Sequence, residues 1–253
     1  MERREEHAIV LESRVSGETG KLVFLLTEQG QLLQAFAPGA GGSRRRFGGA
    51  LEAGARVLAR WSVPREGGGA RLEEAVLEQA PPVPDPLERL YATAHLVDLA
   101  RAFARQGFEE PRLYRLFAGC LEALGRVDTV DPLLRYAELW TLRLAGLWPD
   151  LGRCAVCGRS LEGRTRWVAP DVGAVCAEHR TPASQRLDGR AADWIARAAR
   201  TPPAEVPAPE PATGRLLREV LARWIVDFTD RPLGSLEALE RLRRGAKSRR
   251  RAR

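Results

Sequence analysis

The chain has 253 residues, of which 44% are hydrophobic and 29% are charged, as in an ordinary globular protein. It contains no stretch of the roughly 20 apolar residues that span a membrane. Its charged N-terminus also lacks the apolar segment of a signal peptide. These features exclude a membrane-embedded protein and predict a cytoplasmic one without a membrane partner.

The net charge of +7 is concentrated at the C-terminus. The last thirteen residues, Arg241 to Arg253, hold eight Arg or Lys and no acid, so the rest of the chain has a net charge of −1. A tail of this kind is either a disordered, solubilising end or an arm that binds phosphates by releasing counterions. The sequence leaves both functions open for the basic tail, residues 243–253.

Residues 7 to 77 alternate between short β-type patterns and glycine-rich turns. The β-type patterns are Ala8–Leu11, Leu22–Leu26, Leu32–Phe36, Ala55–Ala59 and Leu72–Leu77. Glycine reaches positive φ at low cost, so the glycine clusters between these patterns predict tight turns. Five short strands predict a small barrel over residues 1–80. A five-stranded oligonucleotide-binding (OB) barrel is one solution, and an SH3-like barrel fits almost as well.

Basic side chains cluster within this region although its overall charge is balanced. Residues 1–80 hold eleven basic and eleven acidic side chains, so only clustering can give the barrel affinity for phosphates. Three adjacent arginines, Arg44 to Arg46, follow a glycine-rich stretch, and we expect them to lie on a flexible loop. The predicted DNA-binding residues are Arg14, Lys21, Arg44, Arg45, Arg46 and Arg56. The aromatic side chains available for base stacking are Phe24, Phe36, Phe47 and Trp61, although strand alternation favours a core position for each.

A proline-rich segment, residues 81–86, predicts a domain boundary because proline stiffens the chain and removes backbone donors. Asp85 is the predicted N-cap of the next helix, with Pro86 at its first position. Apolar residues recur at helical spacing in Leu87–Phe103, Leu113–Leu124, Leu133–Leu147, Ala191–Ala198 and Leu216–Phe228. Gly125 is expected to end the second of these helices. The pattern predicts an α-helical domain in two parts, 85–150 and 186–242.

Cys120 lies on the apolar stripe of the second predicted helix. A free cysteine in such a position behaves as a small hydrophobe, so we interpret Cys120 as a core residue. The alternative is a reactive thiol. Two histidines, His7 and His95, are likewise expected to be structural or surface residues.

The segment between the two helical parts carries a metal-binding pattern. Cys154 and Cys157 form a C-x2-C pair, and Cys176 and His179 form a C-x2-H pair after eighteen intervening residues. Thiolates and imidazoles are the ligands of closed, tetrahedral structural zinc sites. The sequence therefore predicts a zinc-ribbon-like insertion over 151–182, with a strand at Arg166–Ala169. The alternative is a hairpin that has lost its metal.

Motifs of common enzymes are absent from the sequence. It has no G-x-x-x-x-G-K-[ST] phosphate loop, no G-x-G-x-x-G opening a helix and no G-x-S-x-G elbow. A zinc deaminase would show H-x-E ahead of its C-x-x-C, and a zinc hydrolase needs a general base beside an open ligand position. Neither pattern is present, so we expect the zinc to be structural and the protein not to be an enzyme.

The order of these parts resembles the RecO family of bacterial recombination mediators over nearly the whole chain. The residues that carry the resemblance are Val10–Arg14, Leu26–Gly30, Gly39–Ala40 with Ser43–Arg44, Leu142–Leu151 before Cys154, and Arg231–Glu237. Each segment is short, and their order and spacing make the match specific. The arginine tail beyond Gly245 is not part of it.

The resemblance implies a multidomain α+β protein, with an N-terminal OB barrel followed by a helical domain that carries a zinc-binding insertion. It implies binding to single- and double-stranded DNA and annealing of complementary strands. With its partner RecR, such a protein helps the RecA recombinase replace single-stranded-DNA-binding protein (SSB), whose C-terminal tail binds the helical domain. The alternative is a structural adaptor that binds protein or RNA and touches nucleic acid only through its tail.

Overall fold

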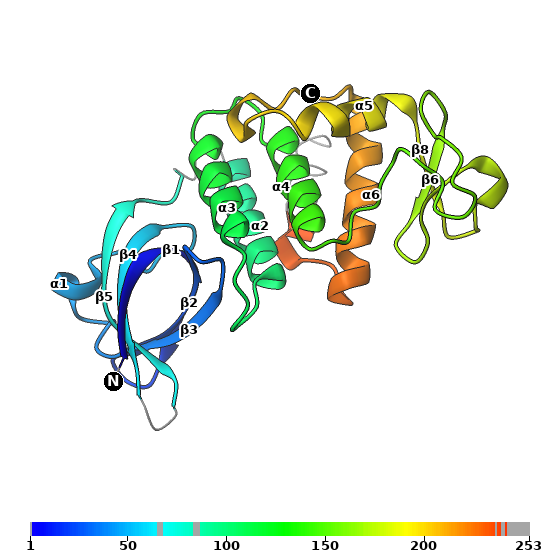
Figure 1. Cartoon of the computed structure of the whole chain (residues 1–253). Helices are drawn as coiled ribbons and strands as arrows, with labels where there is room; N and C mark the ends of the chain where they lie inside the picture. The colour runs from blue at the N-terminus through cyan, green and yellow to red at the C-terminus, as the bar shows by residue number, and fades with distance from the viewer. Residues whose placement is uncertain (1, 65–67, 83–86, 236, 239–240, 242–253) are drawn as a thin grey trace. The chain divides into compact units, whose positions relative to one another are not determined.

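The computed structural model describes residues 2–64, 68–82, 87–235, 237–238 and 241 (Figure 1). Contacts divide the chain into two compact units, Met1–Arg126 with Gly234–Arg253, and Val127–Leu233. The division falls inside the segment 85–150 that we predicted as one helical part. The basic tail at 243–253, and the predicted capping residues Asp85 and Pro86, lie outside the described residues.

In the described part of the first unit, five strands close into a barrel in the order β1-β2-β3-β5-β4 (Figure 1). The strands are β1 (Glu2–Ser16), β2 (Gly20–Thr27), β3 (Leu32–Ala37), β4 (Arg56–Val63) and β5 (Ala70–Gln79). Neighbouring strands pair antiparallel, apart from β3 and β5, which pair parallel. Each predicted β-type pattern falls on one of these strands, so the prediction of five strands is confirmed.

Side chains that alternate along the strands fill the barrel. Small and branched residues such as Ala8, Val23 and Val57 point inward and are fully buried. Removing this apolar surface from water is the main stabilising contribution, at about 25 cal/mol per Å². The core position expected for the aromatic residues is correct for Phe24, Phe47 and Trp61, which are buried. It is wrong for Phe36, whose exposed fraction is 40%.

The three adjacent arginines begin a one-turn helix, α1 (Arg44–Phe47), so the expectation of a flexible loop is wrong at these residues. Arg46 donates hydrogen bonds to the carbonyl of Pro38 (2.8 Å) and to the hydroxyl of Ser43 (3.3 Å). The Phe47 ring is buried in the barrel core. The buried Phe47 ring and the hydrogen bonds of Arg46 therefore fix this segment against the barrel. The side chains of Arg44 and Arg45 lie outside the described residues.

Two helices, α2 (Leu87–Phe103) and α3 (Pro111–Leu124), pack against each other and against β1. The apolar stripe expected for the first helix is wrong at its beginning, because Leu87 and Leu90 are exposed. Cys120 on α3 is fully buried, and burial raises the pKa of its thiol, so its interpretation as a core residue is confirmed. The helix ends before Gly125 as predicted, although that glycine has φ −70° rather than a left-handed conformation.

The second unit combines three helices with a small sheet in its described residues. The helices are α4 (Asp131–Leu144), α5 (Gly189–Ala198) and α6 (Pro211–Thr229). A short 3₁₀ segment, η2 (Pro203–Glu205), lies between α5 and α6, and another, η1 (Ala177–His179), lies in the insertion. α6 packs against both α4 and α5. The helix expected to reach Leu147 ends three residues earlier, since Gly146 has a positive φ of 70°. None of the described helices is long and apolar enough to cross a membrane.

The sheet has the strand order β7-β6-β8 in the described chain, with β6 (Arg166–Ala169), β7 (Gly173–Val175) and β8 (Gln185–Leu187). The strand predicted at 166–169 is confirmed as β6. The two flanking strands were not predicted, because three residues are too few to show a two-residue alternation.

Candidate metal centre and nucleic-acid interface

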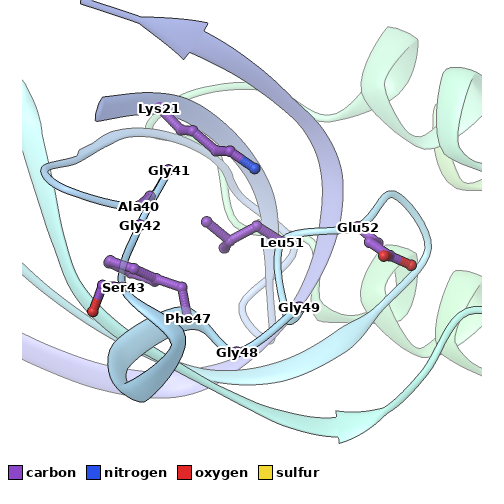
Figure 2. A pocket seen from close by; sticks show the side chains of 10 residues that line it. All are labelled: Lys21, Ala40, Gly41, Gly42, Ser43, Phe47, Gly48, Gly49, Leu51 and Glu52. Carbon is purple, nitrogen blue, oxygen red and sulfur yellow. The ribbon is translucent and has the colours of Figure 1, made fainter. Parts of the chain in front are cut away.

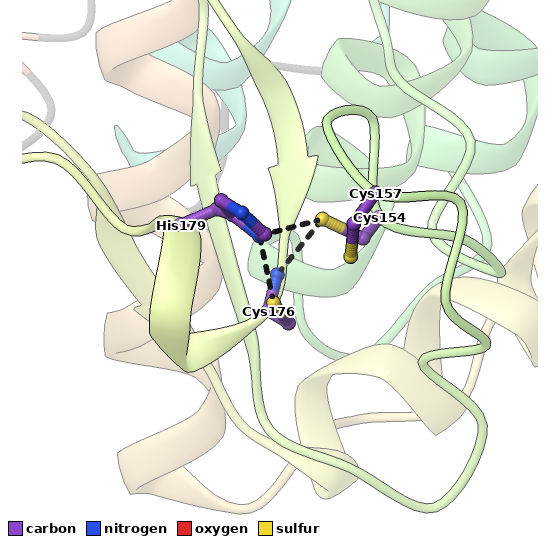
Figure 3. Close-up of side chains that lie close together, drawn as sticks. All are labelled: Cys154, Cys157, Cys176 and His179. Carbon is purple, nitrogen blue, oxygen red and sulfur yellow. Dashed lines mark hydrogen bonds between the residues drawn. The ribbon is translucent and has the colours of Figure 1, made fainter.

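Four side chains with metal-ligating atoms meet beside the small sheet (Figure 3). They are Cys154, Cys157, Cys176 and His179, whose ligand atoms all lie within 4.8 Å of one another. The Nδ1 atom of His179 lies 3.2 Å from the Cys176 sulfur and 3.8 Å from the Cys154 sulfur. The structure therefore brings together all four residues that the spacing predicted.

Local backbone turns orient the side chains of Cys154 and Cys157, which form the first of two metal-binding turns, or knuckles. Cys154 follows a bridge between Arg153 and Ser160, and its N–H donates to the carbonyl of Arg159 (2.9 Å). Gly158 has φ +70°, a conformation that glycine adopts cheaply and that turns the chain back towards the sulfurs.

The second knuckle, which carries Cys176 and His179, is hydrogen-bonded to the first. Cys176 follows β7, and the single turn of η1 presents His179. The backbone N–H of Cys176 points to the Cys154 sulfur (3.5 Å), and the N–H of Ala155 donates to the carbonyl of Ala174 on β7 (2.8 Å). The hairpin β6–β7 thus holds the two knuckles at a fixed separation.

Electrostatics at the cluster favour ionised sulfur at Cys154 and Cys176, whose thiol pKa values are lowered. A hydrogen bond from the backbone of Arg159 favours ionisation of the Cys157 thiol, but desolvation and the neighbouring sulfurs outweigh it and raise the pKa of this thiol. Desolvation opposes ionisation of the Cys154 thiol, but backbone N–H groups of Cys157, Cys176 and Val156 outweigh it and lower the pKa of this thiol to about 6. Hydrogen bonds to the sulfurs of Cys176 and Cys154 raise the pKa of His179. A thiolate is the form of cysteine that binds metal, so the backbone prepares the site for a cation.

The donor set and spacing fit a tetrahedral ion. A zinc ion with bonds of about 2.3 Å to sulfur places its ligand atoms about 3.7 Å apart along the edges of the tetrahedron. The sulfur–nitrogen distances of 3.2 and 3.8 Å at His179 are close to that value. The cluster can therefore hold a metal ion and is consistent with zinc.

The predicted DNA-binding residues of the barrel that have described side chains differ in their surroundings. Arg14 is exposed near the end of β1 and is ion-paired with Glu12. Arg56 begins β4, and its guanidinium lies 3.9 Å from the Glu78 carboxylate. The Arg46 guanidinium is hydrogen-bonded to Pro38 and Ser43 of its own segment. Among the predicted residues with described side chains, Arg14 has the strand position most open to a ligand.

Lys21 lines a pocket of about 260 Å³ where the β3–β4 connection crosses the mouth of the barrel (Figure 2). The buried Phe47 and Leu51 line its apolar part, and Glu52 adds a carboxylate. The remaining lining residues are Ala40, Gly41, Gly42, Ser43, Gly48 and Gly49. The carboxylate of Glu52 offsets the positive charge of Lys21. Charge alone therefore does not make this pocket a strong binding site for anions.

Strand pairing creates a second arrangement, which the sequence did not predict. Arg14 pairs with Leu22, Leu22 pairs with Phe36, and Phe36 pairs with Arg71. Paired residues point to the same face of a sheet, so these four side chains form one row across the outer face of the barrel. Arg71 is exposed and has no ion pair within the described residues. Its position depends on the parallel pairing of β3 with β5, which local sequence patterns do not reveal.

Gly20 supports this outer row. A Cβ atom at Gly20 would lie 2.5 Å from the edge of the Phe36 ring, so the ring lies over bare backbone there. Only glycine permits so close an approach. The edge of the exposed ring is thereby packed against the backbone of β2.

Comparison with known proteins agrees with this architecture. The family described as "Recombination protein O N terminal" matches residues 1–80, and "Recombination protein O C terminal" matches residues 85–237. DNA repair protein RecO of Anaeromyxobacter dehalogenans (strain 2CP-1 / ATCC BAA-258) is 32% identical over 252 residues, covering 96% of this chain and 98% of that protein. DNA repair protein RecO of Myxococcus xanthus (strain DK1622) is 34% identical over 177 residues, covering 70% and 72%. The chain therefore belongs to the RecO family of DNA repair proteins.

Proposed function

We propose that this chain is a recombination mediator that binds single- and double-stranded DNA and anneals complementary strands without covalent chemistry. The observation that carries the proposal is the match of both RecO family parts across nearly the whole chain. The family establishes a role in DNA repair, and the barrel surface supplies a physical means of binding DNA.

The barrel supports an OB-type assignment. Its strand order, with β1 between β2 and β4 and a parallel β3–β5 pair, fits a five-stranded Greek-key barrel. OB barrels bind oligonucleotides on the face of strands 2 and 3. Phe36 and Leu22 lie on the outer face of those strands, with Arg14 and Arg71 on either side. An exposed ring between two guanidinium groups is suited to stack a base and neutralise its flanking phosphates.

Charge neutralisation is what annealing requires. Two DNA strands repel each other through their phosphates, and a protein that binds both lowers this barrier while releasing counterions. No cofactor turnover is involved, so we expect annealing to be independent of ATP and to weaken steeply with salt.

The partners are proposed from the family resemblance. RecR, the RecA recombinase and the C-terminal tail of SSB are the proteins with which the chain would act, in the cytoplasm. The barrel at 1–80 would bind DNA, and the helical parts at 85–150 and 186–242 would bind protein.

We further propose that the cluster of three cysteines and His179 holds a structural zinc ion. The ion would contribute a four-ligand crosslink to the insertion at 151–182, whose described residues contain two short strands, β6 and β7, and the 3₁₀ segment η1. The residues themselves fix the knuckles and exclude water from the buried Cys154 and Cys176.

A strand-annealing assay with and without SSB coating tests the mediator function. A mediator anneals SSB-coated complementary strands, whereas an adaptor that touches nucleic acid only through its tail does not. Deleting residues 241–253 separates the two further: a mediator loses part of its DNA affinity and an adaptor loses nearly all of it. If the full chain fails to anneal even bare strands, the proposal is wrong.

A further inference from the structure

The insertion that carries the metal site, taken together with the strand β8 that follows it, holds more basic than acidic side chains. Residues 151–187 contain six arginines and three acidic residues. Three of the arginines have structural tasks. Arg153 and Arg166 donate to the carbonyls of Gly158 and Leu151, and Arg159 is ion-paired with Glu178 (2.9 Å).

The other three arginines, Arg164, Arg180 and Arg186, are exposed and have no ion pair within the described residues. Two of them flank a single aromatic ring. The guanidinium carbon of Arg180 lies 4.9 Å from the centroid of the Trp167 ring. Arg186 on β8 pairs directly with Trp167 on the central strand β6 and so points to the same face.

This face is held rigidly. Trp167 also pairs with Val175 on β7, which is fully buried and directly precedes the ligand Cys176. Arg180 directly follows the ligand His179. Trp167 is paired with both neighbouring strands, and the N–H of His179, directly before Arg180, donates to the carbonyl of Cys176 (3.1 Å). These hydrogen bonds hold the backbone at both residues and so preorganise the ring and its guanidinium partner.

We propose that Trp167, Arg180 and Arg186 form a second binding site for single-stranded DNA, separate from the row on the barrel. The two guanidinium groups would bind adjacent phosphates, and the partly exposed indole with its stacked guanidinium would hold one base. This inference rests on the proposed annealing function, because annealing needs a place for each of two strands.

The chemistry of the face favours a nucleic acid over an acidic protein segment. Unpaired positive charge would attract either of them. A planar indole with a guanidinium against its face also offers stacking, which every base can use and an acidic side chain cannot. The apolar residues of this sheet, such as Val168 and Val175, are buried, so the face lacks an apolar groove for a peptide.

The test uses the full chain and two double variants of equal charge. R180Q/R186Q removes both unpaired arginines of the site. R215Q/R223Q removes two exposed arginines of α6 in the same unit and is the matched control. Zinc content and thermal unfolding establish that both variants are folded. Each is measured for oligonucleotide affinity against salt, for annealing rate, and for photocrosslinking to a bromodeoxyuridine oligonucleotide.

We expect the wild-type chain and the control to crosslink at Trp167. R180Q/R186Q should reduce that adduct at least fivefold and lower the slope of log affinity against log salt by about 1.4, since each single-strand phosphate contact contributes about 0.7. Annealing should slow by about tenfold while the barrel still binds one strand. The variant W167L should lose the adduct and about tenfold in affinity through stacking alone.

Normal annealing by R180Q/R186Q, with crosslinks confined to the barrel, would overturn this inference and leave the proposed function intact. Loss of binding to a labelled polyglutamate peptide, with DNA binding unchanged, would also overturn it and assign the face to an acidic partner. Failure of the wild-type chain to bind or anneal DNA at all would instead refute the proposed function.

Discussion

The guanidinium carbon of Arg101 on α2 lies 4.3 Å from the centroid of the Phe24 ring on β2. The same guanidinium is ion-paired with Glu12 on β1. Phe24 is buried, with an exposed fraction of 8%, so its ring is not available to stack on a DNA base. One interaction also joins two strands of the barrel to the helix that packs on them.

We predict that Arg101→Ala lowers the free energy of unfolding by about 1–2 kcal/mol, because it removes the cation–π contact and leaves Glu12 with Arg14 as its one remaining ion-pair partner among the described residues. Arg126→Ala is the control, since its exposed ion pair with Glu122 should contribute less than about 0.5 kcal/mol. Urea unfolding of both variants measures the difference. Equal stability of the two would contradict this account of Arg101.

Gly30 and Gly17 form a matched pair of turn glycines. Both have positive φ, 77° and 70°. A Cβ atom at Gly30 would collide with the backbone of Glu110, whereas one at Gly17 would meet nothing within 4 Å. We predict that Gly17→Ala costs about 1 kcal/mol for its conformation alone, and that Gly30→Ala costs at least about 2 kcal/mol more. Thermal unfolding gives both values, and a smaller penalty at Gly30 would show that the loop moves aside.

Zinc binding should depend on pH through Cys154. This thiol must be ionised to bind metal, and its pKa in the metal-free fold is lowered to about 6. The thiolate is thus present at pH 7.5 and is lost as the pH falls through 6. Below that value this ligand alone should lower zinc affinity by about tenfold per pH unit. Competition with a chromogenic chelator between pH 5 and 7.5 measures the slope, and a flat profile would rule out the assigned ionisation.

Phe36 should contribute to DNA binding by stacking. Phe36→Ala removes an exposed ring, so we expect a loss of about 1–3 kcal/mol in single-strand affinity with little loss of stability. Val76→Ala is the control, because Val76 is also exposed on the barrel but lies five residues along β5 from Arg71. Fluorescence anisotropy with a labelled oligonucleotide compares them. A similar affinity for both variants would remove Phe36 from the proposed interface.

Local sequence patterns predicted the strands and most helices because burial imposes its period on the residues directly. Val23 and Leu25 alternate inward, and Cys120 repeats with Leu124 on a helical stripe. The beginning of α2 was misjudged because apolar spacing at Leu87 and Leu90 does not reveal whether another element covers them. The one-turn helix at Arg44–Phe47 depends on Phe47 filling the barrel, which is a tertiary contact.

The metal cluster was predictable, whereas the two proposed DNA surfaces were not. A cysteine pair two residues apart is a local signal with a strong chemical meaning. The row from Arg14 to Arg71 depends instead on pairing between strands that are far apart in the chain. The contact of Arg180 with Trp167 likewise requires the chain to fold back through the knuckle. Such surfaces become visible only when strand register is known.

The parallel junction between β3 and β5 has a kinetic consequence. In the described residues its register joins Ala35 with Ala70 and Phe36 with Arg71, far fewer pairs than the antiparallel ladders on either side. A short ladder that closes a long loop forms late in folding and is the place where amide hydrogens exchange first. A DNA strand lying across Phe36 and Arg71 would bridge this junction. The bound strand would then stabilise the β3–β5 junction and slow the opening of the whole barrel.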